Sequence, residues 1–147
     1  MRPFNSVLVV CVGNLCRSPT GQFLVERGLA NTRVSSAGLM ARADQSACSV
    51  AIEVAAENKL DITSHRATRL SESLILSNDL ILAMDKEQKS AIENMSPVAK
   101  GKVMLFGKWQ HELEIPDPYK RSRETYQIVF QQLETNASLW AEKLEAN

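Results

Sequence analysis

The stretch Val7-Leu-Val-Val-Cys-Val-Gly-Asn-Leu-Cys-Arg-Ser-Pro19 decides how the rest of the chain is arranged. Residues 7–10 are apolar and mostly β-branched, which is typical of a fully buried strand. The pair Ser18-Pro19 is a helix-start pattern, with serine as the cap and proline at the first helical position. The residues between them therefore form a short loop from strand to helix, with Cys11 at one end and Arg17 at the other.

This loop has the composition of an anion-binding, nucleophilic site. Its amides and the positive end of the helix dipole would converge on one point and hold a phosphate dianion together with Arg17. The same field would stabilise a thiolate at Cys11. Gly13 and Asn14 tolerate the unusual backbone that such a loop requires. A cysteine beside a strand can also be simple core packing, but strand, loop and helix together favour the functional interpretation.

Length and composition indicate one domain, residues 1–147, with 44% hydrophobic residues to build its core. Seventeen basic and seventeen acidic residues cancel, so no global field attracts nucleic acid or an anionic membrane. No apolar run reaches the length of a membrane span, and no signal peptide is evident. Three cysteines, an odd number, fit a reducing compartment. We therefore expect a cytoplasmic protein without membrane insertion or nucleic-acid partners.

The order of the elements predicts the fold class. Strands are expected at residues 7–10, 32–36, 79–84 and 102–106, and helices at 19–30, near 71–74, at 86–95 and from about 122. This alternation predicts an α/β fold: a doubly wound, four-stranded parallel sheet with helices on both faces and the phosphate loop after the first strand. Ligands bind such sheets outside the carboxyl ends of the strands, where the Cys11 loop, Ser36 and Asp85 would gather.

Segments outside this framework have simpler interpretations. Residues 36–42 follow a strand end and are a candidate substrate lip, while residues 107–119 form a polar connection of the length common in functional loops. Cys48 lies at helical spacing from neighbouring apolar residues, which favours core packing. The last helix has an apolar stripe at spacings of three and four that predicts core positions: Tyr126, Val129, Phe130, Leu133, Ala137, Trp140 and Leu144.

The run VLVVCVGNLCRSPTGQFLVE, taken with Asp117-Pro118-Tyr119, resembles the low-molecular-weight protein tyrosine phosphatases. It looks most like the bacterial members that dephosphorylate tyrosine kinases of capsule and exopolysaccharide export. The resemblance implies that Cys11 attacks phosphorus to form a phosphocysteine, that Arg17 holds the phosphoryl oxygens, and that Asp117 is first general acid and then general base. It also implies a phosphotyrosine protein as partner, a monomeric enzyme, and no metal or cofactor.

Further site residues are expected around these three. Tyr119 follows the acid closely enough to pack against a substrate ring, with Val12 and Leu15 as the floor of the slot. By resemblance, a hydrogen-bonded set of Asn14, Ser18, Ser36 and His65 holds the loop. Lys120 and Arg42 would form a basic lip that favours acidic peptides. The phosphate would be bound by the loop residues Val12, Gly13, Asn14, Leu15, Cys16 and Ser18.

Cys16 has two interpretations. It lies close enough in sequence to Cys11 to form a protective disulfide after oxidation, or it packs behind the loop.

Three other functions use similar residues. Arsenate reductases share the Cys-x5-Arg loop but need two further cysteines after the central strand, and none follows Cys48. A phosphocysteine carrier of the sugar phosphotransferase type would leave Arg17 and Asp117 without a purpose. A non-catalytic phosphate-binding module would need neither Cys11 nor Asp117. Taken alone, Asp117 is also an ordinary residue of an Asp-Pro turn.

Overall fold

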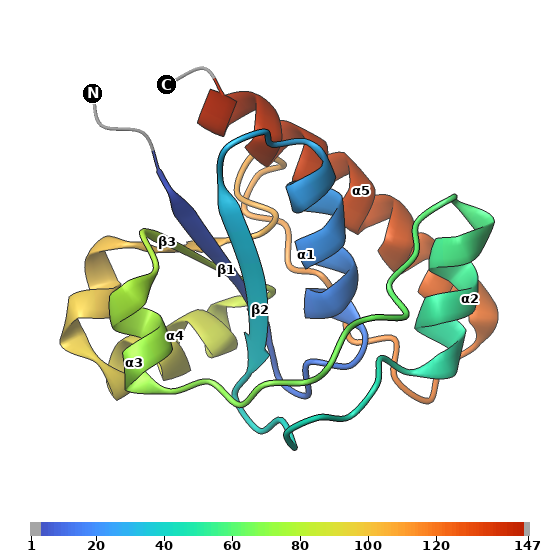
Figure 1. Ribbon diagram of the computed structural model, residues 1–147, viewed down its shortest axis with the longest axis horizontal. Coiled ribbons are helices and arrows are strands. Elements are labelled where there is room, and N and C mark those ends of the chain that lie inside the picture. The colour runs from blue at the N-terminus through green and yellow to red at the C-terminus, as the bar shows by residue number, and fades with distance from the viewer. Residues whose placement is uncertain (1–3, 146–147) are drawn as a thin grey trace.

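The computed structural model describes residues 4–145 of the 147, so the outermost residues of the expected domain, 1–3 and 146–147, lie outside the described part. Strands and helices alternate along the chain (Figure 1). Their order is β1 (Ser6–Cys11), α1 (Arg17–Arg27), β2 (Arg33–Gly38), α2 (Ser49–Glu57), α3 (Glu72–Ser77), β3 (Leu80–Ala83), α4 (Lys86–Met95), a 3₁₀ turn (Pro97–Gly101), β4 (Val103–Leu105) and α5 (Arg123–Glu145).

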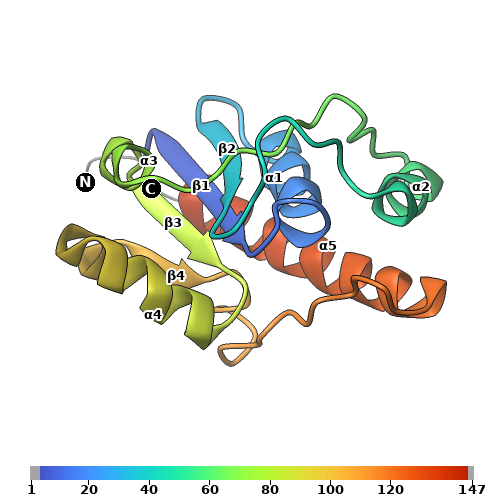
Figure 2. The ribbon, with the colours of Figure 1, turned by 90° about the horizontal axis from the view of Figure 1, so that it is seen from below.

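The four strands form one parallel sheet in the order β2-β1-β3-β4, so the predicted fold class is confirmed. Because neighbouring side chains of a strand point to opposite faces, β1 contributes to two cores. Val7 and Val9 pack on the side of α1 and α5, whereas Leu8 and Val10 pack on the side of α3 and α4. Figure 2 shows these two pairs of helices on opposite sides of the sheet. All four side chains are completely buried, which explains the continuous apolar run.

The start of α1 differs from the sequence prediction. The helix begins at Arg17 with Cys16 as its N-cap residue, so Ser18 and Pro19 lie inside the first turn. The Ser18 hydroxyl does not cap the helix; it lies 2.9 Å from the Cys11 sulfur. A proline is tolerated there because the first-turn amides have no partner within the helix.

Two other boundaries differ. Helix α1 ends at Arg27 rather than near residue 30, and β2 continues to Gly38. The expected lip at residues 36–42 therefore begins inside a strand. The apolar stripe of α5 is buried as predicted, with Trp140 Nε1 donating to the Phe106 carbonyl at 2.9 Å. No helix within residues 4–145 combines the length and apolarity needed to cross a membrane.

Candidate active site

The thiol of Cys11 lies at the base of the loop, residues 12–16, that joins β1 to α1. Only 2% of the residue is exposed. Its Sγ accepts a hydrogen bond from the Asn14 backbone N–H at 3.3 Å, and Ser18 Oγ lies 2.9 Å away. Asn14 Nδ2 donates to Ser18 Oγ at 2.7 Å, so the Ser18 O–H is left to donate to sulfur. Both groups donate a hydrogen bond to the sulfur.

Asn14 ties the loop to two other segments. Its Nδ2 also donates to Ser36 Oγ of β2 at 3.0 Å, and its Oδ1 accepts from the Thr68 backbone N–H at 2.9 Å. Its carbonyl oxygen lies 2.7 Å from His65 Nε2. A carbonyl only accepts, so Nε2 carries the hydrogen. Burial lowers the pKa of His65, which keeps the ring neutral. The structure thus brings together the four residues expected to support the loop.

The backbone of the loop depends on Asn14 and on a glycine outside it. Unusual backbone was expected at Gly13 and Asn14, but only Asn14 has a positive φ, 57°. Asparagine tolerates this region because its short side chain bonds locally. Sequence reasoning missed Gly38, which pairs with Cys11 across the sheet. A Cβ there would lie 2.6 Å from the Val12 carbonyl oxygen and 2.8 Å from the Asn14 nitrogen, so any side chain would push the loop outward.

Arg17 projects from the first turn of α1 and is 4% exposed. Its Nη1 donates to the Ile115 carbonyl at 3.0 Å and lies 3.9 Å from Asp85 Oδ2. Its Nη2 lies 3.8 Å from Asp117 Oδ2. The predicted position of Asp85 beside the Cys11 loop is therefore observed, and Asp117 lies at the same end of the sheet. The Ile115 carbonyl has no signal in the sequence, because any residue type supplies that acceptor.

Two carboxylates at almost equal distance from Arg17 have different surroundings. Asp85 is the N-cap residue of α4 and accepts from the Gln88 backbone N–H at 2.8 Å. Asp117 is 55% exposed at the side chain and accepts from the Tyr119 backbone N–H at 3.0 Å. Only Asp117 lines the pocket described next. The geometry therefore separates a helix-capping carboxylate from one that faces the pocket.

A pocket of about 220 Å³ opens above the thiol. Eight residues line it: Cys11, Val12, Gly13, Leu15, Cys16, Arg17, Asp117 and Tyr119. Asn14 of the loop and Ser18 of α1, expected among the phosphate-binding residues, are completely buried and do not line the pocket. Val12 is 39% and Tyr119 50% exposed at the rim. The pocket thus has a thiol and a cation at its base and apolar side chains around its mouth.

The segment after β2 lies beside the loop, as the lip prediction requires. Leu39 N–H donates to the Cys11 carbonyl at 3.0 Å, and Met40 N–H donates to the Val12 carbonyl at 2.8 Å. The Lys120 ammonium lies 5.6 Å from the centre of the Tyr119 ring. Arg42 is exposed. The selectivity expected of these two cations stays a prediction.

Cys16 lines the pocket wall, but its closest sulfur partner is not in the loop. Its Sγ lies 2.9 Å from Cys48 Sγ, at the N-terminus of α2. The sequence analysis left Cys16 either to pair with Cys11 or to pack behind the loop, and it assigned Cys48 to core packing. Nothing in the sequence indicated the contact, because 32 residues separate the two cysteines.

The arrangement can perform phosphoryl transfer. Amides at the start of α1 and the Arg17 guanidinium provide positive charge where a phosphoryl group would sit above the sulfur. Asp117 lines the same pocket, with its carboxylate 3.8 Å from Arg17. Transfer of a phosphoryl group depends mainly on such positioning and charge stabilisation.

Comparisons with known proteins agree with this geometry. The family model described as low molecular weight phosphotyrosine protein phosphatase matches residues 6–147. The low molecular weight protein-tyrosine-phosphatase Wzb of Escherichia coli K12 is 48% identical over 143 residues, covering 97% of each chain.

Two solved structures have nearly the same fold. The tyrosine phosphatase Wzb from Escherichia coli K30, crystallised with sulphate, has a TM-score of 0.93 at 44% identity and covers 96% of this chain and 99% of its own. Vibrio vulnificus Wzb in complex with benzylphosphonate has a TM-score of 0.92 at 43% identity, covering 95% and 99%.

Proposed function

The chain belongs to the low molecular weight phosphotyrosine protein phosphatase family and is a protein tyrosine phosphatase, and on that premise we propose how its residues divide the reaction. The thiolate of Cys11 attacks phosphorus, and the bond from phosphorus to the phenolic oxygen breaks. Arg17 and the loop amides hold the other phosphoryl oxygens while charge spreads over them. Asp117 gives its proton to the departing phenolate.

The second step regenerates the enzyme. Asp117, now a carboxylate, removes a proton from the water that attacks the phosphocysteine. The sulfur leaves as a thiolate, inorganic phosphate is released, and Asp117 is again protonated. The Ser18 hydroxyl, 2.9 Å from the sulfur, stabilises the thiolate both before attack and after departure. The cycle needs no metal or cofactor.

The single observation that supports this division is the shared pocket. Cys11 and Arg17 come from one segment of the chain and Asp117 and Tyr119 from another about 100 residues later, yet all four line one cavity. The thiol lies at the base and the acid and ring at the rim, so a phosphorylated side chain must be long and flat to reach the sulfur. Phosphotyrosine has this shape, whereas phosphoserine is too short.

We further infer the substrate from the resemblance to bacterial exopolysaccharide-linked phosphatases. The proposed substrate is the phosphotyrosine segment of an autophosphorylated bacterial tyrosine kinase that controls capsule or exopolysaccharide production, met by a monomeric enzyme in the cytoplasm. An exposed basic lip of Lys120 and Arg42 suits acidic residues flanking the tyrosine.

The test of the mechanism compares Cys11→Ser with Cys48→Ser. Both remove one sulfur, but only Cys11 is the proposed nucleophile. Cys11→Ser should abolish turnover of a phosphotyrosine peptide, and an acid-quenched reaction of wild type should contain phosphate on Cys11 by peptide mass spectrometry. Cys48→Ser should retain wild-type kcat/KM under reducing conditions. Turnover of Cys11→Ser within tenfold of wild type would end the covalent mechanism.

The test of substrate class uses matched peptides. A phosphotyrosine peptide should be hydrolysed far faster than the same peptide with phosphoserine, and comparable kcat/KM would contradict the slot geometry. For the physiological partner, Asp117→Ala and Cys11→Ser proteins should retain a tyrosine-phosphorylated kinase from cell extract. Retention should be lost when inorganic vanadate occupies the pocket.

A further inference from the structure

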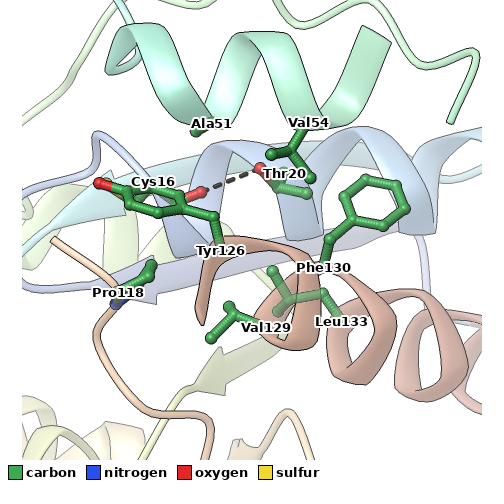
Figure 3. Close-up of a pocket in the computed structure, with 9 residues that line it drawn as sticks. All are labelled: Cys16, Thr20, Ala51, Val54, Pro118, Tyr126, Val129, Phe130 and Leu133. Carbon is green, nitrogen blue, oxygen red and sulfur yellow. Dashed lines mark hydrogen bonds between the residues drawn. The ribbon is translucent and has the colours of Figure 1, made fainter. Parts of the chain in front are cut away.

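Two thiols and a phenol meet at the back of the phosphate loop. Cys16 Sγ and Cys48 Sγ lie 2.9 Å apart. The Tyr126 hydroxyl is 3.8 Å from the first sulfur and 3.6 Å from the second. Figure 3 shows Tyr126 of α5 reaching toward Cys16, with Ala51 and other apolar side chains of α2 and α5 around it. The proposed phosphatase cycle uses neither the Cys48 thiol nor this phenol.

We propose that Cys16 and Cys48 form a second redox site, a dithiol that hydrogen peroxide converts to an intramolecular disulfide without involving the catalytic thiol. The disulfide chemistry requires no phosphatase turnover. The proposed disulfide can therefore be tested independently of the phosphatase function proposed above.

The backbone already holds the two cysteines in place for this bond. Cys48 N–H donates to the Leu15 carbonyl at 3.0 Å, so the segment before α2 is hydrogen-bonded to the residue that precedes Cys16. Cys16 and Cys48 are the N-cap residues of α1 and α2. A disulfide bond is about 2.05 Å long, so the sulfurs must approach by roughly 0.9 Å. Side-chain rotation can supply such a movement while both helices stay in place.

The environment assigns different roles to the two sulfurs. The hydrogen bond with Cys16 lowers the pKa of Cys48 to about 6, and Tyr126 adds to the effect. The hydrogen bond with Cys48, followed by burial, raises the pKa of Cys16. Cys48 is partly exposed, whereas Cys16 is 7% exposed. Cys48 is therefore the thiolate that peroxide reaches, and Cys16 is the protonated thiol that completes the bond.

The reaction balances with peroxide as the oxidant. The Cys48 thiolate attacks one peroxide oxygen, the O–O bond breaks, and a sulfenic acid and hydroxide form. Cys16 sulfur then attacks the sulfenic sulfur, and its proton leaves with the expelled hydroxide as water. Two thiols lose two electrons and two protons, and one peroxide becomes two waters. A dithiol reductant reverses the bond by exchange.

The pair also controls what happens at the catalytic thiol. A Cys16 bound to Cys48 has no thiol left for a disulfide with Cys11, so the two disulfides exclude each other. Cys48 therefore competes with Cys11 for Cys16. In Cys48→Ser, Cys16 becomes available, and peroxide should yield more of the Cys11–Cys16 disulfide than it does in wild type.

The decisive experiment uses Cys11→Ser, which leaves only the proposed pair. Limited hydrogen peroxide should reduce its free thiols from two to none and yield one Cys16–Cys48 cross-linked peptide in a non-reducing digest. Cys11→Ser/Cys48→Ser is the matched control and should form no intramolecular cross-link. Two persisting thiols, a sulfinic acid at Cys48 without a cross-link, or a disulfide only between molecules would overturn the proposal.

Two further measurements guard against a folding defect in the variant. Wild-type protein saturated with inorganic phosphate, which covers Cys11, should give the same cross-linked peptide. If this peptide were absent, the proposed Cys16–Cys48 disulfide would be contradicted. The rate of cross-linking should rise with pH around a midpoint near 6, where Cys48 becomes a thiolate. A midpoint near 8.5, the value of an ordinary thiol, would overturn the assignment of Cys48 as the attacking sulfur.

Discussion

Asp117→Asn tests the acid role because the chain contains a matched carboxylate. Asp117 Oδ2 lies 3.8 Å from Arg17, and Asp85 Oδ2 lies 3.9 Å from the same guanidinium. Either substitution replaces a carboxyl group by an amide at nearly the same distance from Arg17. Only Asp117 lines the pocket and can give a proton to the leaving oxygen. The difference between the two asparagine variants therefore isolates proton donation.

The expected magnitude follows from the exposure of the two side chains. Proton donation by a positioned group supplies about 10² to 10⁴ in rate, or roughly 3–5 kcal/mol. Asp117 is 55% exposed, so water can replace part of its function, and the loss should be near the lower limit, about 10²-fold. A solvent-screened charge is worth up to about 1 kcal/mol, so Asp85→Asn should stay within roughly fivefold of wild type.

The assay is kcat/KM over a series of aryl phosphates whose phenols differ in acidity. This ratio reports the steps up to the phosphocysteine, so the later use of Asp117 as a base does not enter. The loss in Asp117→Asn should be largest for phenols as basic as tyrosine, with a pKa of about 10, and should shrink for p-nitrophenol. Equal losses across the series, or the same loss in Asp85→Asn, would refute the acid role.

Other predictions concern the surroundings of the thiol. Ser18→Ala removes the hydroxyl that lies 2.9 Å from Cys11 Sγ. A hydrogen bond to a charged group is worth about 1.5–3 kcal/mol, so kcat/KM should fall roughly 10- to 100-fold. Iodoacetamide should also alkylate Cys11 more slowly in this variant. Tyr119→Ala should raise KM for phosphotyrosine peptides more than it lowers kcat, and an unchanged KM would contradict ring packing. Lys120→Glu should lower kcat/KM for acidic peptides alone, an effect that salt weakens. Burial lowers the pKa of His65 in the folded protein, so the unfolded chain takes up a proton first as the pH falls. The contribution of His65 to the free energy of unfolding is therefore complete above about pH 6.5 and decreases below that pH. In urea unfolding, His65→Gln should flatten this decrease between pH 7.5 and 5.5.

Local sequence determined the strands, the loop chemistry and the family. An unbroken apolar run predicts a strand buried on both faces because β1 lies between two neighbours and two helix layers. The Cys-x5-Arg spacing predicts an anion site because one strand-to-helix turn brings both ends of the loop to the same amides. These inferences depend on residues close together in the chain, where spacing limits geometry. The boundaries of α1 and β2 were less accurate, because helix ends depend on where side chains bond.

Only the tertiary structure decided which distant groups meet the loop. The need for glycine at position 38 follows from the register that pairs it with Cys11. The Arg17 bond to the Ile115 carbonyl depends on the path of the long connection before α5. The contact of Cys16 with Cys48 depends on how α2 packs against α5 and on the hydrogen bond from Cys48 N–H to the Leu15 carbonyl. Sequence spacing contains none of this, because contacts across 32 or 98 residues are set by packing of the whole domain.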